Sequence, residues 1–474
     1  MEFPISLHDL QATAPITVVS TVALLVLLFD ALGKRLRPYT GWLGIAGLLA
    51  AAVLAIQSIE SSGHAFLGMV HTGGTASYFA LVFSVSGGLS LLFSQVYNRT
   101  QHIDHGEFNA LVLLSVVGMM LMGSAADLVI FFLGLELMSI CFYVLAGFAR
   151  GKLTSNEAAL KYFLLGAFAT GFLLYGIALV YGSTGTTSIA RILEHGSVDS
   201  TLFLIGLGLL AIGLAFKVAA VPFHMWVPDV YEGAPTTVSG FMSTGGKAAA
   251  FAAFLIIFAP TVVERVNSLR DVLAALAMLS MIVGNVLAIS QTNIKRMLAY
   301  SSVAHAGYIL VGVVAANEAG ANGVLFYLLA YTVMNIGAFG VVSIGETREG
   351  HNLTFDEYSG LGSRRPALAA LMALFMFSLT GIPPFAGFFG KYYVFAGAIE
   401  AGYTWLAIVG VLMSVVSAYY YLRLVVVMYF REEESALTPA VPAVSLVALL
   451  LSATGVIGMG MFPSIILSLT RFAF

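Results

Sequence analysis

Residues 215–236 read AFKVAAVPFHMWVPDVYEGAPT, and residues 381–393 read GIPPFAGFFGKYY. Each stretch belongs to a long apolar run, and each joins a lysine to prolines. Proline lacks a backbone donor and breaks or kinks a helix. At membrane depth, non-helical backbone is tolerated only where it lines a cavity or is buried in protein. The two stretches therefore predict a membrane protein with two interrupted helices, each close to a lysine.

The composition agrees with a membrane protein. Hydrophobic residues make up 59% of the 474 residues, charged residues only 9%, and the mean hydropathy is +0.95. Soluble domains carry about 25% charged residues, so lipid is the natural solvent for most of this chain. The net charge of -3 offers no basic field for nucleic acid. A single cysteine, Cys141, excludes a disulfide framework and a cysteine-ligated iron–sulfur cluster.

Runs of about 20 mostly apolar residues mark the candidate membrane spans. They number fourteen and lie near 13–33, 40–60, 75–96, 107–123, 126–147, 157–181, 200–226, 234–258, 270–290, 298–316, 321–345, 366–399, 403–430 and 440–466. Only Gly123-Ser124-Ala125 separates the fourth run from the fifth. A count of thirteen therefore stays open.

The basic residues of the loops predict the orientation of the spans. The even-numbered loops and the two tails hold four, namely Arg191, Arg265, Arg270 and Arg471. The odd-numbered loops hold twelve, namely Lys34, Arg35, Arg37, Arg99, Arg150, Lys152, Lys295, Arg296, Arg348, Arg364, Arg365 and Arg431. Cytoplasmic loops carry the excess of Lys and Arg. We therefore expect cytoplasmic odd-numbered loops and both termini on the outer, periplasmic side.

A few charged residues fall inside the predicted spans. An ionisable side chain there costs several kcal/mol and is a functional hypothesis by default. Glu136 lies about ten residues from either end of its span, roughly 15 Å deep at 1.5 Å per residue. The basic residues within spans are Lys161, Lys217, Lys247, Lys391 and Arg423.

Plainer roles exist for some of these charges. Lys161, about one turn from the span edge, could extend to the membrane surface. Glu136 could form a structural ion pair with Lys161 or Lys217. Arg423, among tyrosines near the end of its span, is typical of an interfacial anchor. One ion pair would still leave several deep lysines without a carboxylate.

Buried amines suit proton transfer. Burial disfavours the charged form of a lysine, so a buried lysine can take up and release protons near neutral pH. His224 follows Lys217 by seven residues, which predicts one helical face and a place in the same relay. His305 is either a relay member or a hydrogen-bonding strut between helices.

The interrupted spans also predict an internal repeat. They are the seventh and the twelfth, and an interval of five spans reverses the orientation, as inverted-repeat transporters require. The predicted fold is all-α and polytopic, with about 14 transmembrane helices. Its predicted parts are helices 1–3 (1–106), a first repeat of helices 4–8 (107–258), a second repeat of helices 9–13 (270–430) and helix 14 (440–474).

Several segments resemble the antiporter-like membrane subunits of respiratory complex I, the NADH-quinone oxidoreductase. They are LGLELMS around Glu136, the 215–236 segment, STGGKAA around Lys247, NIKRMLAYSSVAHAGY at 293–308 and GIPPFAGFFGKYY. The resemblance runs from about 107 to 430. Among the three similar types L, M and N, a lysine at position 391 resembles the N type. The alternative is a subunit of a multisubunit Na+/H+ antiporter, and a third possibility is a structural subunit with a vestigial polar row.

The resemblance implies a function and a site. It implies a proton-translocating subunit of the membrane arm, in a bacterial cytoplasmic (inner) membrane, driven by redox chemistry elsewhere. The implied relay is Glu136 paired with Lys217, Lys161 on the input side, His224 and Lys247 in the centre, and Lys391 toward the periplasmic exit. No cofactor or metal is implied in this chain. NADH, FMN, iron–sulfur clusters and quinone belong to partner subunits, which include the M-type subunit and small membrane subunits.

Overall fold

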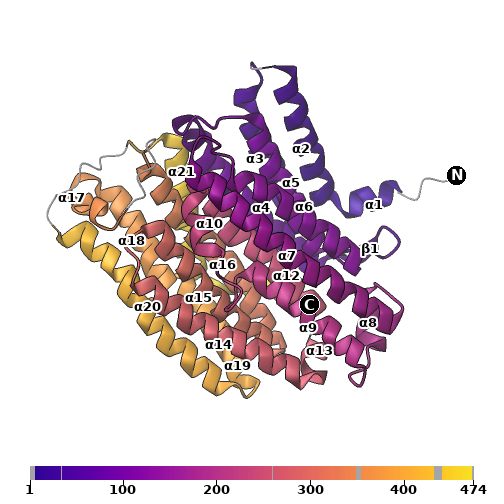
Figure 1. Ribbon diagram of the computed structural model, residues 1–474. Helices are drawn as coiled ribbons and strands as arrows, with labels where there is room; N and C mark the ends of the chain where they lie inside the picture. Colours follow the sequence, from indigo (N-terminus) through magenta and orange to yellow (C-terminus); the bar gives the residue numbers. More distant parts are fainter. Residues whose placement is uncertain (1–5, 34, 259, 348–353, 432–439, 472–474) are drawn as a thin grey trace.

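The computed structural model describes residues 6–33, 35–258, 260–347, 354–431 and 440–471. Long helices lie side by side in one bundle, with α2 and α3 at one edge and α20 at the opposite edge (Figure 1). The first half contains α1 (Leu7–Ala12), α2 (Ala14–Leu32), α3 (Arg37–Ser58), α4 (Gly74–Thr100), α5 (Gly106–Gly123), α6 (Leu128–Ala146), α7 (Leu153–Thr184), α8 (Ile189–His195), α9 (Thr201–Val218), α10 (Val227–Gly233), α11 (Thr236–Phe241), the π-helix η1 (Met242–Gly246) and α12 (Lys247–Ile257).

The second half is also helical. It contains α13 (Pro260–Arg265), α14 (Asn267–Ile289), α15 (Ile294–Ala315), α16 (Glu318–Gly345), the 3-10 helix η2 (Asp356–Tyr358), α17 (Leu361–Arg364), α18 (Pro366–Thr380), α19 (Ala386–Glu400), α20 (Thr404–Phe430), α21 (Ala443–Met461) and α22 (Pro463–Thr470). Counted over the described residues, thirteen helical stretches are long and apolar enough to cross a membrane. The chain is therefore an all-helical polytopic membrane protein.

The thirteen stretches match thirteen of the fourteen predicted spans. The twelfth predicted span instead holds α18 and α19, which have fifteen residues each and are separated by residues 381–385. The fourth and fifth spans are separate helices, because α5 ends at Gly123 and α6 begins at Leu128. The Gly-Ser-Ala linker is thus a real boundary.

The helices α9 and α18 end in the same way. The residue after each helix, Ala219 or Gly381, has left-handed backbone, with φ of 63° and 91°. Positive φ is uncommon for residues other than glycine, so Ala219 marks a constrained position. A proline, Pro222 or Pro384, follows three residues later in both places and prevents the helix from continuing.

A two-stranded hairpin was not predicted from the sequence. Strands β1 (Ser62–Ala65) and β2 (Val70–Gly73) pair antiparallel. Each has only four residues, and the segment has no apolar run, so a search for membrane spans passes over it. The loop between α5 and α6 joins this hairpin through a bridge between Val70 and Ala125.

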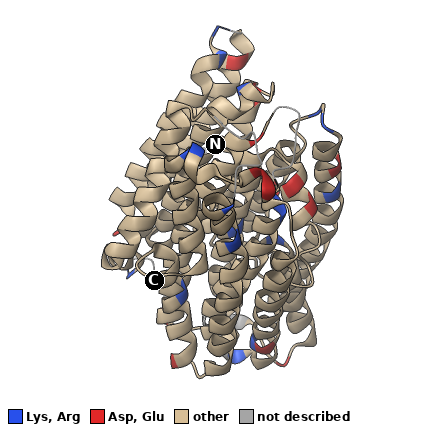
Figure 2. Ribbon diagram, turned by 90° about the vertical axis from the view of Figure 1, so that its left-hand side faces the viewer, with Lys and Arg blue, Asp and Glu red and all other residues tan. Residues whose placement is uncertain are grey.

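The loops gather on two faces of the bundle. On one face, Lys152 pairs with Glu346, and Arg431 pairs with Asp356. In the numbering of the fourteen predicted spans, these two contacts join odd-numbered loops. The contact between the hairpin and the α5–α6 loop joins even-numbered loops. Figure 2 shows charged residues mainly toward the helix ends, with a few basic residues inside the bundle. Two residues of the charge count, Lys34 and Arg348, lie outside the described residues.

Glycines bring neighbouring helices close together. A Cβ added at Gly118 of α5 would lie 2.6 Å from the backbone oxygen of Gly134 in α6. Likewise, a Cβ at Gly307 of α15 would lie 2.7 Å from the backbone nitrogen of Met281 in α14. Membrane helices pack closely where small residues face each other.

We predict that Gly118→Ala destabilises the protein by about 1–3 kcal/mol, because its Cβ meets backbone that cannot rotate away. The thermal midpoint of the detergent-solubilised complex measures this loss. The control is Gly88→Ala in α4, where an added Cβ meets nothing within 4 Å. Equal midpoints for the two variants would contradict the close packing of α5 on α6.

Candidate functional site

A row of basic side chains lies inside the bundle. Lys217, Lys247, His305 and Lys391 have relative exposures of 5%, 2%, 1% and 5%. They come from α9, α12, α15 and α19. Within the described part of the chain, none of the ion pairs involves any of these four residues. Their partners are hydroxyl groups and backbone carbonyls.

Lys217 lies in the last turn of α9 and contacts α6. Its Nζ donates to Ser139 Oγ at 2.7 Å and lies 5.7 Å from the ring centre of Tyr143. Glu136 is one turn before Ser139 on the same helix and accepts a hydrogen bond from Thr170 Oγ1 at 3.0 Å. Ser139 is therefore the direct partner of Lys217, and Glu136 lies near the lysine without forming an ion pair in the described residues.

Lys247 is the first residue of α12, directly after the π-helical turn η1. Its Nζ donates to the hydroxyl of Ser302 at 2.9 Å and to the backbone carbonyl of the same residue. A π-helical turn inside a membrane helix often occurs at a functional site. Here it immediately precedes a buried lysine.

His305 follows Ser302 by three residues on α15, so the two lie one turn apart. Its Nδ1 is hydrogen-bonded to Tyr327 OH at 2.8 Å, and its Nε2 to Tyr421 OH at 3.0 Å. The Tyr421 hydroxyl also bonds to the hydroxyl of Ser301. Ser302 and His305 thus follow one another along α15, and Lys247 of α12 is bonded to Ser302.

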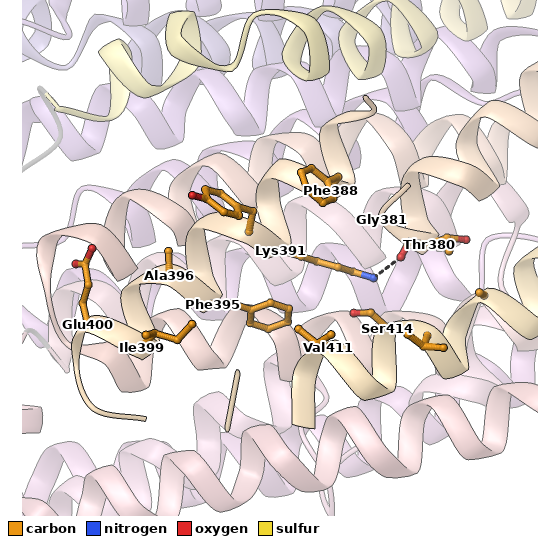
Figure 3. Close-up of a pocket in the computed structure, with 13 residues that line it drawn as sticks. Thr380, Gly381, Phe388, Lys391, Phe395, Ala396, Ile399, Glu400, Val411 and Ser414 are labelled. Atoms are coloured by element: carbon orange, nitrogen blue, oxygen red, sulfur yellow. Dashed lines mark hydrogen bonds between the residues drawn. The ribbon is translucent and has the colours of Figure 1, made fainter. Parts of the chain in front are cut away.

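Lys391 ends the row. Its Nζ donates to the backbone carbonyls of Thr380 at 2.8 Å and Leu379 at 3.2 Å, and it lies 4.7 Å from the ring centre of Tyr308. The side chain lines a cavity of about 710 Å³ between α19 and α20. Figure 3 shows the ammonium directed at Thr380, with Glu400 at the far end of the cavity.

His224 does not lie as the sequence predicted. The expected common face with Lys217 assumed an uninterrupted helix, but α9 ends at Val218. His224 lies in the turns between α9 and α10, and it is half-buried. The spacing argument for this residue was therefore wrong, since helical periodicity does not cross the break.

Lys161 is half-exposed and paired with carboxylates. Its Nζ lies 2.6 Å from Glu157 and 2.7 Å from Asp229. Arg296 contacts the same Asp229 at 2.8 Å. Burial alone would raise the pKa of Asp229, but the hydrogen bonds from Lys161 and Arg296 outweigh it and hold the pKa below its usual value. Lys161 thus reaches the charged end of the bundle, as the surface interpretation expected.

Several polar partners were missed in the sequence. A serine gives no signal of pairing, because serine hydroxyls in helices often bond to their own backbone. A tyrosine does not reveal from the sequence which helix its hydroxyl contacts. The charged end of α10 lies outside the apolar runs and was not considered. Those missed are Ser139, Asp229, Glu232, Ser302, Tyr327, Glu346 and Tyr421. No cluster of three or more His, Cys, Asp or Glu residues in the described ranges is arranged to hold a metal.

We predict that Asp229→Asn lowers stability by about 0.2–1 kcal/mol, the range of partly exposed ion pairs. Because the folded pKa of Asp229 is depressed, the stabilisation is complete above its usual value of 3.8 and is lost only as the pH falls through the lower folded value. The loss of thermal midpoint should therefore be equal at about pH 6 and about pH 8. Asp271→Asn on the exposed start of α14 is the control; a loss that changes between these pH values would contradict the assignment.

Comparison with known proteins places the chain in a family. Residues 125–417 match the family described as NADH:quinone oxidoreductase/Mrp antiporter, TM. The chain is 48% identical over 470 residues to NADH-quinone oxidoreductase subunit N of Trichlorobacter lovleyi, covering 98% of this chain and 96% of that one. It is 47% identical over 460 residues to the subunit N of Salinibacter ruber, with 96% and 92% covered.

A solved structure gives the same result. A chain of respiratory complex I from Thermus thermophilus superimposes with a TM-score of 0.83 at 34% identity, over 96% of this chain and 98% of that one. The family match covers more than half of the chain, and the relatives cover nearly all of it. The resemblance found in the sequence is confirmed. The chain belongs to the subunit N family of NADH-quinone oxidoreductase, the antiporter-like membrane subunits of the respiratory complex I translocase.

Proposed function

We propose that this chain moves protons across the membrane, driven by redox chemistry in other subunits of complex I. The observation that carries the proposal is the set of buried lysines whose partners are uncharged oxygens. A structural ion pair would need a carboxylate at each lysine. The proposed relay consists of Glu136, Lys161, Lys217, His224, Lys247, His305 and Lys391.

The contacts suggest how a proton moves. A protonated lysine is held by hydroxyl and carbonyl oxygens, whereas a neutral one fits the apolar surroundings, so each amine can alternate between two states. From Lys247, Ser302 leads one turn along α15 to His305, which can accept and donate through its two ring nitrogens. The Tyr308 ring lies between His305 and Lys391, at 5.7 Å from the histidine ring.

Charge near Lys217 gives a means of control. Glu136 is half-buried and one turn from Ser139, and its negative charge favours the protonated lysine. A change in the charge or position of Glu136 would alter how firmly Lys217 holds its proton. Coupling through such neighbouring charges can pass from one subunit to the next.

The driving energy has to come from partners. Each proton moved against 100 mV requires about 2.3 kcal/mol. We propose that NADH, FMN, iron–sulfur clusters and quinone in other complex I subunits supply it. The M-type antiporter-like subunit and the small membrane subunits are the proposed neighbours in the bilayer.

Two inverted repeats are proposed, within 107–258 and 270–430. Three features support them. The helices α9 and α18 both end in a left-handed residue followed three positions later by proline. The first two helices of each proposed repeat, α5 with α6 and α14 with α15, pack closely at glycines. Lys217 precedes its break and Lys391 follows its own, so the two lysines lie on opposite sides of similar interruptions.

We propose a bacterial inner-membrane orientation with odd-numbered loops in the cytoplasm and both termini in the periplasm. Contacts among odd-numbered loops on one face support it, as does the charge bias. In this orientation Lys161 faces the cytoplasmic side. Lys391 then belongs to the path toward the periplasm.

The alternative is a subunit of a multisubunit Na+/H+ antiporter. One observation favours it: the matched family covers Mrp antiporters as well. A sodium-coupled protein should respond to sodium and work without NADH. A structural role with a vestigial polar row would leave proton transport unaffected when a buried lysine is neutralised.

We predict that Lys217→Ala abolishes NADH-driven proton uptake in inverted membrane vesicles, together with quinone reduction, because the proton path and the redox chemistry are coupled. Native gels verify that the complex assembles. Arg431→Ala, which removes an exposed ion pair, is the matched control and should pump at the parental rate. Pumping by an assembled Lys217→Ala complex at the parental rate would identify the lysine row as structural.

We also predict that replacing sodium by choline leaves NADH-driven proton uptake unchanged, since the proposed relay carries protons only. The same vesicles provide the measurement, with an uncoupler as the control for leak. Uptake that falls in proportion to sodium would favour the antiporter alternative.

A further inference from the structure

A half-buried carboxylate lies where α4, α11 and α16 meet. Glu346 directly follows α16, and its side chain is 9% exposed. It accepts hydrogen bonds from Tyr97 OH at 2.8 Å and from the hydroxyl of Thr236. The ammonium of Lys152 lies 3.7 Å away, on the face that carries the odd-numbered loops. The proposed relay does not use this carboxylate.

A second contact joins α4 to the helical segment of α11 and η1, farther from Glu346. Ser86 Oγ of α4 is hydrogen-bonded to Thr244 Oγ1 of η1 at 3.0 Å. Thr244 precedes Lys247 by three residues, one helical turn. Tyr97 follows Ser86 by eleven residues, which corresponds to about 16 Å along α4. One seam therefore connects the surroundings of Glu346 with those of Lys247.

Between these two contacts lie hydroxyl groups without a protein partner. Ser90 and Ser94 of α4 and Thr237 of α11 are 2%, 1% and 5% exposed. Their hydroxyl oxygens form no hydrogen bond to any described residue. Ser86, Ser90 and Ser94 are four residues apart and therefore follow one side of α4.

Such hydroxyls are unusual in a membrane helix. Serine and threonine normally bond to the carbonyl four residues earlier, as Thr244 does with Gly240 at 3.0 Å. A buried hydroxyl without a partner destabilises the fold, because it has lost its hydrogen bonds to water. Ordered water, which needs two to four polar partners, removes this cost. Ser86, Ser90 and Ser94 place one hydroxyl at each successive turn of α4.

We propose that the seam between α4 and α11 is a water-lined proton path that leads from Glu346 to Lys247. This inference rests on the proposed function and adds a route of proton uptake that does not pass through Lys161 or Lys217. Glu346 takes a proton from the aqueous face, and each water or hydroxyl accepts one proton and donates another. The Lys247 amine receives the last proton and becomes an ammonium, so one proton is transferred and no redox partner is needed.

The test compares two double variants of the assembled complex. Valine and threonine have the same shape, but only threonine keeps the hydroxyl. We expect Ser90→Val with Ser94→Val to lose NADH-driven proton uptake, and Ser90→Thr with Ser94→Thr to retain it. Equal uptake by the two double variants, whether both pump or both fail, would overturn the path. Ser84→Val is the matched control, since Ser84 is also buried and without a partner but lies about 160° around α4 from Ser86.

A second variant keeps the inference testable if the valines prevent assembly. Glu346→Gln retains an oxygen that accepts from Tyr97 and Thr236 but cannot carry a proton. We expect it to assemble and to lose proton uptake; parental uptake would overturn the path. Lys247→Ala distinguishes failure of the proposed lysine relay from failure of the path along α4. If Lys247→Ala pumps normally, the proposed function fails; if it stops pumping while the valine and glutamine variants continue, only the path fails.

Discussion

An ammonium group inside a membrane protein must find oxygen atoms, because lipid and apolar side chains cannot solvate it. In this chain each deep lysine finds them on another helix: Lys217 on α6, Lys247 on α15 and Lys391 on α18. These contacts fix which helices lie next to one another in the bundle centre. The aromatic residues then fill the space around the oxygens. The polar row therefore depends on how the helices pack, and the packing depends on the polar contacts. A change in either would disturb the other.

The ends of α9 and α18 serve this requirement. A helix that ends inside the bundle leaves backbone carbonyls without partners, and such carbonyls are acceptors for a cation. The end of α18 gives two of them to Lys391. The glycine pair of α5 and α6 lets these helices approach closely, and Ser139 on α6 accepts from Lys217 of α9. Small residues and helix ends thus place the oxygens that the lysines need.

Much of the fold could be predicted from the sequence, since hydropathy and buried charge are local properties. Thirteen spans and the burial of Lys217, Lys247 and Lys391 followed from them. The partners of Lys217, Lys247 and His305 could not be predicted, because they belong to distant parts of the chain; Tyr421 lies 116 residues from His305. The face assigned to His224 was wrong because the end of a helix depends on a left-handed residue that hydropathy does not reveal. Glu346 was missed because a loop carboxylate usually faces water.

The acceptors of Lys391 have a genetic consequence. They are main-chain oxygens, so no side-chain replacement removes them, and an alanine scan across α18 would pass over the partner of a central residue. What holds these oxygens in place is the point at which the helix stops. That point depends on Gly381, whose φ of 91° disfavours any residue with a Cβ, and on the prolines that follow. Substitutions in the turn that ends α18 are therefore expected to have the same effect as substitutions of Lys391, because this turn positions the main-chain oxygens that hold the ammonium.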